Sequence, residues 1–177
     1  MDFVEIMNTY FRGEKIESAF FVVPVGLLLW AMAFGAWRTE QGGFMWGVFV
    51  PSVLMGLVYV GAGIAVAART GDQVAALEAG FGSDAAAMLS EEVPRMQQVV
   101  QNFHVALVIF GVIGVSGLVF RFAVPTDWAI GLGAVLVLVS GVGLLVDGFA
   151  ERRSRPYMAA LEALALEHGV ASQPTGD

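Results

Sequence analysis

"AFFVVPVGLLLWAMAFGAW" (19–37) decides the fold class, because these nineteen residues contain no charged side chain. A helix needs about 20 apolar residues to cross the hydrocarbon core of a bilayer. Three further segments have a similar length and composition, at 44–68, 103–120 and 128–146. Since 57% of the chain is hydrophobic and only 14% is charged, too little polar sequence remains to cover a soluble core. We therefore predict four transmembrane helices and not a β-barrel, whose strands would alternate polar and apolar residues.

The distribution of basic residues predicts how these spans are oriented. The short links 38–43 and 121–127 carry two basic residues, whereas the N-terminus, the 69–102 segment and the C-terminal tail carry the other seven. By the positive-inside rule, these three segments and both termini face the cytoplasm. Trp37, Trp46 and Trp128 lie at the opposite boundary, where indole rings are favoured.

These features together predict an all-α integral membrane protein, an antiparallel four-helix transmembrane bundle. Its first hairpin covers 18–68 and its second covers 103–147. The N-terminal residues are acidic and lack the basic region of a signal peptide, so we expect the first span to stay in the mature protein. The basic-residue bias then favours a bacterial inner membrane as the location.

Residues 1–17 carry apolar side chains at helical spacing, which predicts an N-terminal amphipathic helix. We expect it to lie in the plane of the membrane interface. The alternative, which is compatible with this, is docking on the protein's own cytoplasmic loop. The residues on its apolar face are Phe3, Ile6, Met7, Tyr10 and Phe11.

The other cytoplasmic segments are also predicted to be helical. Segment 69–102 should be a helical loop in which Ser90 caps a helix that continues into the third span. Segment 148–169 is predicted to form a separate C-terminal helix, because its stretch 155–169 is rich in Ala and Leu and has Pro156 near its start. The polar residues 170–177 are expected to be a disordered tail.

Small residues recur along the second, third and fourth spans and are candidates for helix packing. Lipid provides little hydrophobic gain for helix association, so small side chains that allow close backbone approach favour it. Their partners are either the other spans of this chain or a second membrane protein. The predicted packing residues are Ser52, Gly56, Gly63, Gly111, Gly114, Gly133 and Gly141.

Every charged residue lies at or outside the end of a predicted span, which argues against a proton relay or a charged selectivity ring at mid-membrane. The polar side chains there are Ser52, Tyr59, Ser116 and Ser140. We expect each hydroxyl to bond a carbonyl one turn back on its own helix.

Four polar residues are predicted to lie at a similar depth at the cytoplasmic mouth: Glu17, Arg69, His104 and Asp147. A carboxylate beside His104 would raise its pKa and create a pH-sensitive group. One interpretation is therefore an ion or ligand vestibule, or a gate. The other is an interfacial belt of charges that anchors the bundle, and we favour it. One histidine and two carboxylates from different helices do not form a recognisable metal site.

The composition also limits the function. The chain has no cysteine and a net charge of -7, which argues against thiol chemistry and against nucleic acid as a partner. Metalloprotease, serine-hydrolase and phosphate-loop motifs are absent, so we expect no catalytic residue, cofactor or metal.

The leading hypothesis is a non-enzymatic membrane protein, either an assembly subunit or a protective, immunity-type protein. Its partners would be the lipid bilayer and a second copy or another membrane protein. The alternative is a small homo-oligomeric ion channel or transporter with a vestibule near His104 and Asp147. A membrane enzyme that acts on lipids is a third and weaker hypothesis.

Overall fold

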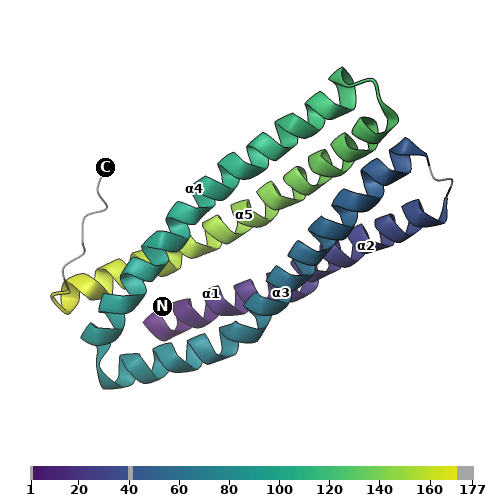
Figure 1. Cartoon of the computed structure of the whole chain (residues 1–177). Coiled ribbons are helices and arrows are strands. Elements are labelled where there is room, and N and C mark those ends of the chain that lie inside the picture. The colour runs from purple at the N-terminus through teal and green to yellow at the C-terminus, as the bar shows by residue number, and fades with distance from the viewer. Residues whose placement is uncertain (1, 40–41, 171–177) are drawn as a thin grey trace.

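The computed structural model describes residues 2–39 and 42–170, and within them the chain is helical apart from short links. Four continuous helical segments, 3–38, 43–83, 85–123 and 127–167, are long and apolar enough to cross a membrane. This confirms the all-helical fold with four long apolar helices (Figure 1). The elements are α1 (Phe3–Glu17), the π-helical segment η1 (Ser18–Val22), α2 (Val23–Arg38), α3 (Gly43–Ser83), α4 (Ala85–Ala123) and α5 (Asp127–Glu167).

Helices α1, η1 and α2 form one continuous helical segment, in which α1 ends at Glu17, the predicted end of the N-terminal helix. The π-helical turn lies just before Pro24, and the Val23 N–H bonds to the Ser18 carbonyl, five residues back. Proline lacks an N–H and its ring collides with the carbonyl four residues earlier. A wider turn at this point accommodates the proline without ending the helix.

Segment 69–102 is helical and forms two arms, the end of α3 and the start of α4, joined by a tight turn at Asp84. Asp84 caps α4, because its carboxylate accepts a hydrogen bond from the Ala87 N–H at 3.0 Å. The predicted cap at Ser90 is wrong, since Ser90 lies inside α4 and donates to the Ala87 carbonyl at 2.7 Å. The run of alanines after Asp84 explains the earlier start, because alanine has the highest helix propensity.

Helix α5 continues from the fourth span through Pro156 to Glu167 without a break. The segment predicted as a separate helix at 148–169 is therefore the end of α5. Burial of Tyr157, Leu161 and Ala165 on one side of this stretch offsets the cost of the proline. The predicted tail 170–177 lies, apart from Val170, outside the described residues.

The helices stand in a row with α2 and α4 on the outside. Helix α2 packs on α3, α3 packs on α5, and α5 packs on α4. Helices α3 and α4 share a turn and diverge from it (Figure 1). In the most apolar stretch of each segment, a larger share of residues is buried in the inner helices than in the outer ones. The share is 39% in α5 and 33% in α3, against 22% in the first segment and 6% in α4.

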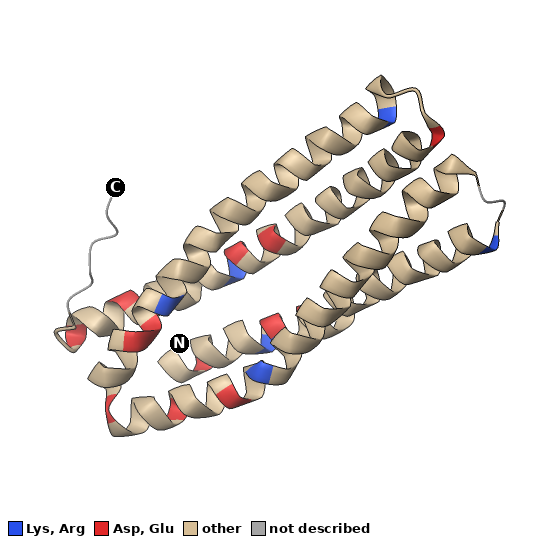
Figure 2. Ribbon diagram, viewed as in Figure 1, with Lys and Arg blue, Asp and Glu red and all other residues tan. Residues whose placement is uncertain are grey.

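Charged residues gather at one end of the row (Figure 2). We call the part formed by 3–17, 69–102 and 147–167 the polar end. A core of large side chains holds it together, with Tyr157 at 0% exposure in its centre. The apolar face of α1 belongs to this core, so α1 is docked on the protein's own helices, as in the alternative that we gave for it. The buried members are Phe3, Met7, Tyr10, Phe11, Met88, Leu89, Val93, Met96, Tyr157, Leu161 and Ala165.

Glycines allow the spans to approach closely at several crossings. A Cβ added at Gly133 would lie 2.5 Å from the Gly117 carbonyl oxygen, so α4 and α5 are in backbone contact there. Gly56, Gly63 and Gly114 also face neighbouring atoms, and Ser52 is fully buried.

Gly111 and Gly141 differ from the other predicted packing residues. An added Cβ at either would meet no atom within 4 Å. They therefore make no helix contact in this chain, because they lie on sides of α4 and α5 that no other helix covers. The sequence argument missed Gly117 and also Gly47, which packs against Trp128.

Two mid-span hydroxyls join neighbouring helices. Ser140 of α5 donates to the Phe110 carbonyl of α4 at 2.7 Å. Tyr59 of α3 donates to the Val139 carbonyl of α5 at 3.2 Å. The expectation of a bond within the same helix is wrong for both, because each side chain faces a closely packed partner helix.

Candidate functional site

A cleft with a volume of about 380 Å³ lies where the apolar spans meet the polar end. Its walls come from α1, η1, α3, α4 and α5, so all four continuous helical segments line it. Its charged lining residues are Glu14, Glu17, Arg69, Arg95, Asp147 and Arg153. This concentration of charge at a span boundary makes it the candidate functional site.

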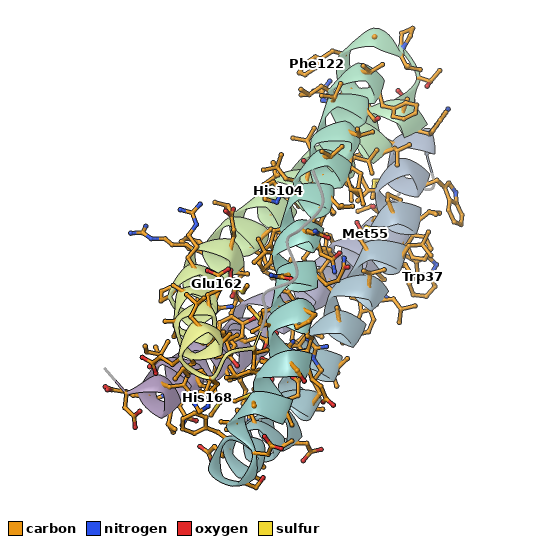
Figure 3. All side chains as sticks on the ribbon, turned by 90° about the vertical axis from the view of Figure 1, so that its left-hand side faces the viewer. Trp37, Met55, His104, Phe122, Glu162 and His168 are labelled. Atoms are coloured by element: carbon orange, nitrogen blue, oxygen red, sulfur yellow. The ribbon has the colours of Figure 1, made fainter. Side chains whose placement is uncertain are left out.

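The cleft brings together three of the four residues that we predicted at the mouth. Glu17, Arg69 and Asp147 line it, whereas His104 does not. His104 is exposed on α4, with its Nδ1 3.2 Å from the Val100 carbonyl oxygen. Figure 3 labels His104 and shows its position on α4. The alternative that we did not favour, a pairing of His104 with a carboxylate in a shared vestibule, therefore has no counterpart in this arrangement.

The charged residues of the cleft pair with partners that the sequence argument did not identify. Arg153 contacts Glu17 at 2.6 Å, and Arg69 contacts Glu14 at 3.4 Å. Gly13 makes room for the first pair, because a Cβ added there would lie 3.0 Å from Nε of Arg153. These contacts tie α1 to α5 and to α3 across the cleft.

Asp147 differs from the other carboxylates of the cleft. Its Oδ2 is buried and has no hydrogen-bond partner, and within 2–39 and 42–170 no basic nitrogen lies within 4.0 Å of its carboxylate. It lies one residue past the apolar segment 128–146. Burial raises the pKa of this carboxyl, and the nearby negative charge of Glu17 raises it further. A charge held this way is costly unless a proton or a cation neutralises it.

A second charged network connects the cleft to the core of the polar end. Arg95 contacts both carboxylate oxygens of Glu92 at 2.6 Å. The hydroxyl of Tyr157 donates to Glu92 at 2.7 Å, and its ring stacks on Tyr10 with centroids 4.9 Å apart. Because Glu92 is only 5% exposed, these donors compensate for its burial.

The network also shifts the pKa values of its two tyrosines and of Arg95. Burial, followed by the negative charge of Glu92, raises the pKa of Tyr157. Burial raises the pKa of Tyr10 to about 12, and the hydrogen bonds to Glu92 raise the pKa of Arg95. Nothing in the sequence marks the contact of Glu92 with Tyr157, 65 positions away.

Within 2–39 and 42–170, no group of three or more His, Asp or Glu side chains could hold a metal ion. Comparisons with protein-family models, with curated proteins and with solved structures found no match to this chain.

Proposed function

We propose that the four helices form an antiparallel transmembrane bundle in a bacterial inner membrane, with both termini in the cytoplasm. The support is the length and composition of the four segments and the grouping of charges at one end (Figure 2). Seven of the nine basic residues lie in the three segments of that end, which is the pattern of cytoplasmic segments.

We further propose that the protein acts through contacts with other membrane proteins and not as an enzyme. It would serve as an assembly subunit or as a protective, immunity-type protein. The observation that carries this proposal is the uncovered side of α4, whose most apolar stretch is only 6% buried.

Uncovered glycines on the packed pair α4 and α5 add to this apolar surface. Gly111 on α4 and Gly141 on α5 have open space at the Cβ position. They lie at the same depth, because Ser140 donates to the Phe110 carbonyl. Small uncovered residues let the backbone of another helix approach closely, which is a main source of helix affinity in lipid. The partner is a second copy of the chain or another membrane protein.

Cysteine cross-linking tests this proposal with little background, because the chain has no cysteine of its own. Val112 is 61% exposed beside Gly111. A Val112→Cys variant in native membranes should give one discrete cross-linked protein product. Adding Gly111→Leu should abolish that product, because the new side chain fills the space that a partner helix would occupy.

The matched control is Gly61→Leu, since Gly61 of α3 also has no atom within 4 Å of an added Cβ. This change should leave the cross-link intact. The absence of any discrete product from Val112→Cys, or an equal loss with both leucine substitutions, would refute the protein-contact proposal.

The charged cleft favours one alternative function, a small homo-oligomeric ion channel or transporter with its vestibule at Asp147. Purified protein in liposomes should then pass ions, and Asp147→Asn should change the flux. His104, which lies outside the cleft, should have no such effect when replaced by alanine. Liposomes without measurable flux would exclude this alternative.

A further inference from the structure

The lining of the cleft changes character along its depth. Towards the spans its walls are apolar, with Val22, Val66, Phe103 and Val146, whereas the opposite side carries the charged residues. The predicted span boundaries at 68/69, 102/103 and 146/147 all pass through this lining. If the spans cross a bilayer, the cleft lies at the level where lipid headgroups meet the hydrocarbon core.

The charges of the cleft leave one anion without a partner. Glu14 and Glu17 are paired with arginines, and Arg95 is paired with Glu92. Among the described residues that line the cleft, the Asp147 carboxylate has no ion pair, and its Oδ2 has no hydrogen bond. A buried carboxylate without an ion pair needs a proton or a cation to neutralise it, and a cation is the partner that a ligand can supply.

An unused donor lies in the same cleft. The Nε of Arg153 is buried and has no acceptor, although the other end of the guanidinium contacts Glu17. A ligand that satisfied both unpartnered atoms would carry a cationic donor for Asp147 and an anionic acceptor for Arg153. An ammonium group joined to a phosphate by a short linker has this combination.

The dimensions and position of the cleft agree with such a ligand. Its volume of about 380 Å³ falls in the range of small-molecule sites, roughly 300–1,000 Å³. Helices α3 and α4 form two of its walls and diverge from their shared turn (Figure 1). The apolar part of the lining can accommodate the glycerol and the first methylenes of an acyl chain.

We propose that this cleft binds the headgroup of phosphatidylethanolamine, with the ammonium on Asp147 and the phosphate beside Arg153. A primary ammonium donates three hydrogen bonds, whereas the methylated ammonium of phosphatidylcholine donates none. The site therefore selects for the primary amine. This inference is independent of the partner surface on α4, which lies outside the cleft.

The test is lipid binding to delipidated, detergent-solubilised full-length protein, measured by native mass spectrometry. The lipids are phosphatidylethanolamine, phosphatidylcholine and phosphatidylglycerol with identical acyl chains, and soluble phosphoethanolamine is the arm without a lipid tail. Phosphatidylethanolamine should bind about 10-fold or more tightly than phosphatidylcholine, as expected for loss of a charge-assisted hydrogen bond.

The variant Asp147→Asn keeps the side-chain shape and should reduce this binding by about 10-fold. The matched control is Asp72→Asn, since Asp72 is an exposed carboxylate of α3 that does not line the cleft. This control should bind like the unaltered protein. The comparison of headgroups on the unaltered protein keeps the test decisive even if Asp147→Asn does not fold.

Several results would overturn the inference. Equal binding of phosphatidylcholine, or a preference for phosphatidylglycerol, would show that no primary amine is selected. Unchanged binding by Asp147→Asn would show that a proton neutralises this carboxyl. Tight binding of soluble phosphoethanolamine would show that the site takes a free amine and not a lipid. None of these results would affect the cross-linking expected at Val112.

Discussion

Replacing Tyr157 with phenylalanine should selectively loosen the polar end. The change removes one hydroxyl from a side chain that is 0% exposed, and that hydroxyl donates to Glu92 at 2.7 Å. A hydrogen bond to a charged group contributes about 1.5–3 kcal/mol. Because Arg95 still contacts both oxygens of Glu92, we expect the lower part of this range, about 1.5–2 kcal/mol.

Amide hydrogen exchange in lipid nanodiscs measures this local free energy. A loss of about 1.5–2 kcal/mol corresponds to roughly 10- to 30-fold faster exchange, confined to the amides of 88–96 and 157–165. The amides of α2 should be unchanged, since α2 is not part of this core.

Tyr10→Phe is the matched control for Tyr157→Phe. Tyr10 is 4% exposed and belongs to the same core, but within 2–39 and 42–170 its hydroxyl makes no hydrogen bond to another residue. Its loss should change exchange by less than about threefold, the size of a surface substitution. Equal effects of the two substitutions, or no effect of Tyr157→Phe, would refute the role assigned to the bond with Glu92.

Three further predictions concern pH, a helix crossing and a cap. Because the pKa of Tyr10 rises from about 10 in the unfolded chain to about 12 in the fold, its stabilising contribution is fully present below pH 10. That contribution should be lost between pH 10 and 12 in unfolding followed by circular dichroism, and Tyr10→Phe should weaken this dependence. Gly133→Ala should destabilise the protein by about 1–3 kcal/mol through collision with the backbone of α4. Gly141→Ala, which meets no atom within 4 Å, should be neutral or stabilising in the same thermal unfolding assay. Asp84→Ala should cost about 1 kcal/mol and speed exchange in the first turn of α4, whereas Ser90→Ala should leave that turn unchanged because Ser90 lies inside the helix.

The apolar segments were predictable because their length and composition suffice to define helices. Their ends were not, because the helices continue into polar sequence. Asp84 and Ser90 are both favourable N-cap residues. Which of them caps α4 depends on whether the residues between them, such as Met88 and Leu89, pack into the core of the polar end. Such packing is a property of the folded chain and not of a local pattern.

The level of the candidate site along the helices was predictable, but the direction in which each of its side chains points was not. Their positions at the ends of the predicted spans placed Glu17, Arg69 and Asp147 at one level, and all three line the cleft. Which residues pair depends on the rotation of each helix and on the order of the helices in the row. The π-helical turn at Ser18–Val22 adds to the difficulty, because one extra residue rotates the following helix by about 100°. No sequence periodicity could therefore relate the face of α1 to that of α2.

The unbroken passage of α3, α4 and α5 from the spans into the polar end has a mechanical consequence. Each is about 60 Å long at 1.5 Å per residue along its path, and no non-helical residue separates its two ends. If about 20 residues project beyond the boundary, the projecting arm is about 30 Å long. A tilt of a few degrees within the bilayer then displaces the far tip by a few ångströms. If the apolar segments cross a bilayer, a small reorientation of one of them would therefore be amplified at the polar end.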